Sequence, residues 1–75
     1  MTLPDIPLLA PVALVTDVPE HGLTRGQMGT VVEFLEAGGE RALLVEFTDV
    51  QGRTKAMAPL KPDQLMVRHR GSEAA

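Results

Sequence analysis

The chain contains no cysteine, so neither a disulfide nor a thiolate metal site can stabilise it. It also lacks tryptophan and tyrosine, and its only aromatic residues are Phe34 and Phe47, which we expect in the core. This scarcity disfavours a groove for proline-rich peptides and a surface on which nucleic-acid bases stack. A structural zinc site is not expected either, because cysteine is absent and the two histidines, His21 and His69, lie far apart in the sequence.

Long apolar runs are also missing. None approaches the roughly 20 residues that a membrane-spanning helix needs. The first residues do not show the basic stretch followed by a continuous apolar segment that is typical of a secretory signal. We therefore expect a cytoplasmic protein. With 75 residues, the chain should form one domain with a small core built from valine, leucine, methionine and alanine.

Glycine or proline interrupts nearly every window long enough for a helix, so the sequence indicates an all-β fold. The clearest strand covers residues 42–48, where apolar and other residues alternate with period two. Leu43, Val45 and Phe47 form its apolar face. We predict five short strands, at residues 12–15, 30–35, 42–48, 53–58 and 65–68.

The connections between these strands have distinct turn signals. Residues 16–28 form a long first loop, and Gly26 and Gly29 flank the entry to the second strand. At Gly29 we expect a positive φ or a close backbone approach. Gly38 and Gly39 predict a tight hairpin turn with positive φ angles, and Gly52 ends the next turn. Pro59 should stop the fourth strand.

Residues 61–64 predict a single 3-10 turn before the last strand. Five strands with tight hairpins fit a small closed or half-open barrel, since closure removes exposed sheet edges. The predicted organisation is an irregular N-terminal segment at 1–11, a barrel at 12–69 and a flexible tail at 70–75.

Several stretches resemble a family of similarly short bacterial proteins classed as a domain of unknown function. The resemblance is carried by residues 12–23, 25–33, 45–47, 52–54 and 63–65. More distantly, Gly26, Gly29 and Val31 are similar to an element of KOW-type barrels and of small barrels in oxidoreductase and hydratase subunits. The resemblance implies a five-stranded SH3-like barrel with a long first loop. It supplies no activity.

The candidate chemistry is sparse, and we expect no enzyme, no cofactor and no metal site. His21 follows Glu20 in the first loop, which is compatible with a general base but more typical of an exposed loop histidine. Asp17 is expected to accept backbone N–H bonds across the loop rather than to bind a cation. No serine or threonine lies in a nucleophile-elbow pattern.

The favoured hypothesis is a non-catalytic protein-interaction or accessory module, either an enzyme subunit or a toxin-neutralising protein. Its binding surface would use the long first loop and the adjacent hairpins. The candidate partner-binding residues in this loop are Asp17, Glu20, His21, Leu23 and Arg25.

Charge is unevenly distributed, with bases concentrated after residue 52. Opposite charges can pair across the sheet, or the bases can form a patch that binds an acidic partner. The candidate patch consists of Arg53, Lys55, Lys61 and Arg68. The alternative function is KOW-like RNA binding through this patch, against which the net charge of −3 weighs.

Apolar residues are also predicted on the outside of the sheet or along the N-terminal segment. They are Leu44, Met57 and Met66, together with Ile6, Leu8 and Leu9. If these side chains are exposed together, a homodimer or a larger protein partner is expected.

Overall fold

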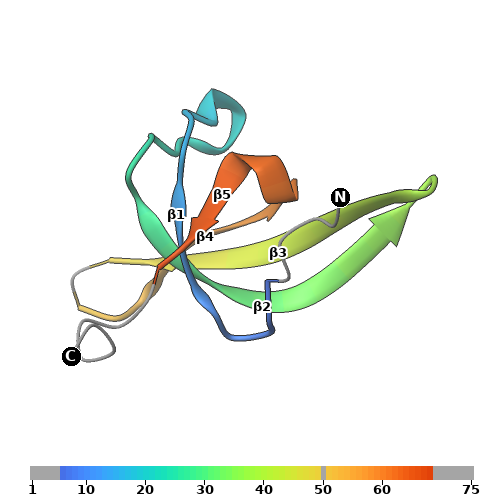
Figure 1. Cartoon of the computed structure of the whole chain (residues 1–75). Helices are drawn as coiled ribbons and strands as arrows, with labels where there is room; N and C mark the ends of the chain where they lie inside the picture. Colours follow the sequence, from blue (N-terminus) through green and yellow to red (C-terminus); the bar gives the residue numbers. More distant parts are fainter. Residues whose placement is uncertain (1–5, 50, 69–75) are drawn as a thin grey trace.

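The computed structural model describes residues 6–49 and 51–68, and over these residues the protein is all-β. The strands form one five-stranded antiparallel sheet in the order β4-β3-β2-β1-β5, with a long loop between β1 and β2 (Figure 1). The strands are β1 (Pro11–Leu14), β2 (Met28–Ala37), β3 (Glu40–Thr48), β4 (Thr54–Leu60) and β5 (Leu65–Val67). Two 3-10 turns, η1 (Pro19–His21) and η2 (Pro62–Gln64), precede β2 and β5. The prediction of an all-β chain with five strands close to the expected ranges is confirmed.

The core lies on one face of the sheet, which we call the inner face. Alternation along β3 places Leu43, Val45 and Phe47 on this face, and all three are buried as predicted. The other strands and the first loop add the rest of the core, namely Val12, Leu14, Val18, Leu23, Val31, Ala58, Leu60 and Leu65. The opposite side of the sheet is called the outer face below.

The sheet is not closed, since β4 and β5 are its two ends in the part of the chain that the structure describes. The hydrogen-bonded closure of the predicted barrel is therefore absent there. The prediction that Pro59 stops the fourth strand is wrong, because β4 continues through it to Leu60. Proline is tolerated here because β4 is an edge strand, where its missing N–H costs no ladder bond.

Gly29 explains how closely the strands approach one another at the end of the first loop. It lies opposite Val12 on β1 and Phe47 on β3. A Cβ atom at this position would lie 2.7 Å from Val45 Cγ1, 2.8 Å from the Glu46 carbonyl oxygen and 2.9 Å from Phe47 Cδ2. Gly29 is therefore required by close packing, whereas Gly26 has the positive φ, of 93°.

The predicted turns are also confirmed. Gly38 and Gly39 connect β2 to β3 with φ angles of 59° and 81°, as a two-residue hairpin turn requires. The predicted 3-10 turn before the last strand is η2. Residues 1–5 of the predicted irregular segment and the predicted tail at 70–75 lie outside the described residues.

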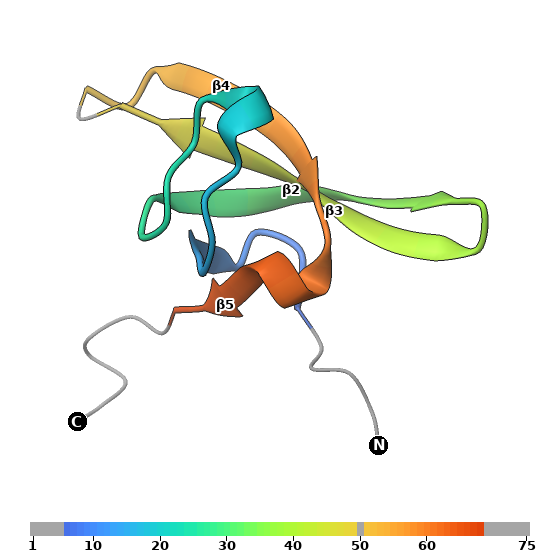
Figure 2. The same ribbon diagram turned by 90° about the horizontal axis from the view of Figure 1, so that it is seen from above.

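The prediction that Phe34 is a core residue is wrong, since 52% of its surface is exposed. Phe34 pairs with Leu43 on the inner face, but β4 ends at Leu60, also opposite Leu43. Beyond this point β2 and β3 pair only with each other and extend away from the sheet as a hairpin, as Figure 2 shows. The side chain therefore lies where the covering elements stop.

Two alanine substitutions separate close packing from turn strain. Gly29→Ala should destabilise the protein by about 3 kcal/mol, because its Cβ overpacks the core. Gly38→Ala should cost about 1 kcal/mol, because its only penalty is a left-handed backbone in open space. Thermal melts of both variants measure the difference. Equal losses of stability would contradict the close-packing role of Gly29.

The two phenylalanines provide a second matched pair. Phe47→Ala should cost about 3–5 kcal/mol, since Phe47 is 1% exposed and central to the core. Phe34→Ala should cost less than about 1 kcal/mol, because its side chain is half exposed. Urea denaturation of the two variants tests the assignment, which fails if Phe34→Ala is the more damaging change.

Candidate functional site in the first loop

The first loop, residues 15–27, is closed at its base by backbone hydrogen bonds. Leu14 donates its N–H to the Gln27 carbonyl at 2.9 Å, and Gly26 donates to the Leu14 carbonyl at 2.8 Å. Gln27 Oε1 also accepts the Thr24 N–H at 2.7 Å. These bonds hold the two ends of the loop next to each other, where β1 ends and β2 begins.

A second set of bonds fixes the outer half of the loop. Val18 and Leu23 exchange backbone hydrogen bonds of 2.9 and 3.1 Å, and both side chains are buried in the core. Asp17 Oδ1 accepts the N–H of Arg25 at 2.8 Å, as predicted for Asp17. The loop is thus a narrow double strand, anchored by two apolar side chains and crossed by a carboxylate.

The tip of this double strand is η1, which runs between the two anchors. Glu20 and His21 lie in it, and Gly22 ends it with a φ of 68°. Figure 1 shows the tip standing at one end of the sheet, beyond β1. Both tip side chains are exposed, and the buried Val18 and Leu23 hold the backbone on either side of them.

The structure changes the predicted set of loop residues in one respect. Leu23 is only 1% exposed, so it anchors the loop and does not offer a contact to a partner. Asp17, Glu20, His21 and Arg25 are exposed, and these four residues are called the outer-loop surface below. Burial of Leu23 follows from the apolar spacing of Val18 and Leu23 within an otherwise polar loop.

The outer-loop surface offers charges and one imidazole for surface contact. Within the described residues, no group of three or more histidine, aspartate and glutamate side chains is arranged to hold a metal ion. The Asp17 carboxylate is already engaged with the Arg25 backbone, which leaves Glu20, His21 and the Arg25 guanidinium as the groups that face outward.

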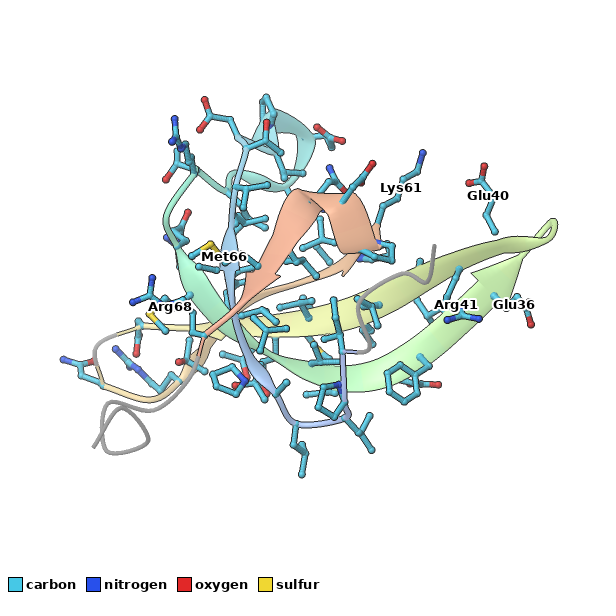
Figure 3. The ribbon with its side chains drawn as sticks, in the orientation of Figure 1. Glu36, Glu40, Arg41, Lys61, Met66 and Arg68 are labelled. Carbon is cyan, nitrogen blue, oxygen red and sulfur yellow. The ribbon has the colours of Figure 1, made fainter. Side chains whose placement is uncertain are left out.

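The predicted basic patch is dispersed. Arg53 forms an ion pair with Asp49, with its Nε 3.4 Å from Oδ2. Lys61 precedes η2 and Arg68 follows β5, and Figure 3 shows these two side chains well separated. Lys55 is exposed on β4, at the sheet edge. The four bases therefore do not converge on one site.

Sequence reasoning missed two residues that shape the loops. The side-chain oxygen of Gln27 accepts hydrogen bonds from both the backbone N–H and the hydroxyl of Thr24. A threonine followed three residues later by a glutamine is a spacing typical of such bonds between side chain and backbone. Asp49 fixes the β3–β4 turn, where its Oδ1 accepts the N–H groups of Gln51 and Arg53 at 2.8 and 3.0 Å. An aspartate at the start of a glycine-containing turn is a readable signal for this role.

The sequence profile of one family, described as Domain of unknown function (DUF4926), matches residues 8–67, which include all five strands and the first loop. The chain belongs to this family. No curated protein matches this DUF4926 chain, and no solved structure matches it. Among the described residues of the DUF4926 domain, no helix has the length and apolar character needed to cross a membrane.

The Asp17 bond can be tested by comparison with a neighbouring acid. Asp17→Ala should destabilise the protein by about 1 kcal/mol, because the Arg25 N–H loses its acceptor. Glu20→Ala, which removes an exposed carboxylate from the tip, should change stability by no more than about 0.5 kcal/mol. Guanidinium denaturation at neutral pH checks both values, and equal effects would show that the Asp17 bond does not hold the loop.

Proposed function

We propose that this protein is a non-catalytic interaction or accessory module that binds another protein through its outer-loop surface. We further propose that its fold is a half-open SH3-like barrel. The strand order, the long first loop and the 3-10 turn before the last strand support this relation. The proposed partner is an enzyme to which the chain acts as a subunit, or a toxin that it neutralises.

The observation that carries the proposal is the anchoring of the loop at Val18 and Leu23. A loop of 13 residues between β1 and β2 ordinarily loses conformational entropy when it binds. Here two buried side chains and their mutual backbone bonds have already fixed it. Glu20, His21 and Arg25 are therefore preorganised for contact, which a loop without binding function does not require.

Charge reversal in the full chain tests the proposal. A tagged protein is expressed at native level in its own cell, and co-purified proteins are identified by mass spectrometry. Arg25→Glu should abolish recovery of the partner, because it replaces the arginine of the outer-loop surface with a negative charge, which repels the group of the partner that Arg25 attracts. Lys55→Glu, the matched base-to-acid change on β4, should retain the partner.

The RNA-binding alternative predicts the opposite pattern. If the bases bind RNA, Lys55→Glu should remove a salt-sensitive mobility shift with mixed RNA and Arg25→Glu should leave it unchanged. We expect no shift at low salt for the wild-type protein. Partner loss on Lys55→Glu but not on Arg25→Glu would reject the outer-loop surface as the binding site.

A further inference from the structure

A small apolar patch lies on the outer face of the sheet, at the end formed by β1, β2 and β5. Ala13 pairs with Met28 on β2 and with Met66 on β5, so the three side chains form one row across three strands. Ala13 faces outward, since its neighbours Val12 and Leu14 are in the core, yet it is buried. Met28 and Met66 are 52% and 46% exposed on either side of it.

A row of polar groups runs beside this patch. Arg68 donates its N–H to the Pro11 carbonyl, Pro11 pairs with Thr30, and Thr30 pairs with Glu46. This row therefore has a guanidinium at its β5 end and a carboxylate two strands beyond Pro11, on β3. Figure 3 shows Arg68 and Met66 on the same side of the ribbon, as expected for residues two apart on one strand. Neither charge of this row forms an ion pair within residues 6–49 and 51–68, although the Glu46 carboxylate accepts a hydrogen bond from the Thr54 hydroxyl.

We propose that this outer face binds the same face of a second copy of the chain, around a twofold axis that runs along the strands between β1 and β2. Such an axis exchanges β5 with β3 and β1 with β2. It places Arg68 against Glu46 of the second copy, and Met28 against Ala13 of the second copy. Each protomer supplies both members of each pair, as an isologous interface requires.

Self-complementarity selects a second copy over another occupant. The charges lie at equal distances on the two sides of the proposed axis, one strand beyond β1 and one beyond β2. Ala13 has the smallest side chain in its row, which leaves space on the outer face. In the proposed dimer, the flexible side chain of Met28 from one copy fills this space over Ala13 of the other copy. A patch of like charge would instead have favoured a different partner.

Sedimentation equilibrium of the full chain, from about 1 µM to about 1 mM, tests the proposal. The wild-type protein should show a reversible monomer–dimer equilibrium that weakens at high salt, since two ion pairs contribute. Met28→Lys should raise the dissociation constant at least about tenfold. Phe34→Lys is the matched control, because Phe34 is 52% exposed but lies on the opposite, inner face. It should leave the constant unchanged.

Two charge variants provide a readout that loss of folding cannot imitate. Arg68→Glu and Glu46→Arg should each fail to dimerise alone, because both ion pairs become repulsive. An equal mixture of the two should dimerise, because each contact then joins a glutamate to an arginine. Circular dichroism first establishes that both variants are folded.

A wild-type protein that stays monomeric to about 1 mM would overturn the proposal. So would a mixture of the charge variants that remains monomeric, or a Phe34→Lys change as damaging to the dimer as Met28→Lys. This face does not include the outer-loop surface. Loss of the dimer with retention of the co-purified partner would reject only the present inference, and the reverse result would reject only the proposed function.

Discussion

The fold depends on a position without a side chain, Gly29, packed between β1 and the aromatic ring of Phe47. Strand β2 is shared by both halves of the sheet, and it pairs with β1 on one side and β3 on the other. At Gly29 the inner face has no room for a Cβ atom. The two halves can therefore approach closely enough for residues of β1, β3 and β4 to form one core. In a chain with so few aromatic residues, this contact sets the density of packing.

The first loop uses the same core as its anchor. Val18 and Leu23 enter the cluster that Gly29 makes possible, and their backbone groups bond to each other across the loop. The charged tip is thereby tied to the sheet by buried side chains and backbone hydrogen bonds. The outer face, by contrast, carries half-exposed methionines. A small sheet that packs on one side only leaves its second side available for association.

Period-two alternation and the turn residues between the apolar stretches were sufficient to predict five strands, to within a few residues, and the β2–β3 hairpin turn. Residues 61–64 predicted the 3-10 turn before β5. Composition could not place Phe34, whose burial depends on where β4 ends and not on its own hydrophobicity. The end of β4 was itself misplaced, because a proline is compatible with an edge strand and the sequence does not tell which strand is at the edge. Likewise, the first loop was located correctly, but Leu23 was predicted to contact a partner protein. The sequence alone does not show the core residues, distant along the chain, against which Leu23 packs.

Native-state hydrogen exchange measured by NMR tests most directly whether the first loop is a fixed surface. The amides of Val18 and Leu23 donate across the loop, while that of Gly39 lies in the hairpin turn. The account predicts that the Val18 and Leu23 amides exchange as slowly as the Val31 amide in the core, and that the Gly39 amide exchanges rapidly. Exchange of Val18 and Leu23 at the rate of Gly39 would contradict it, because the loop would then open independently of the sheet.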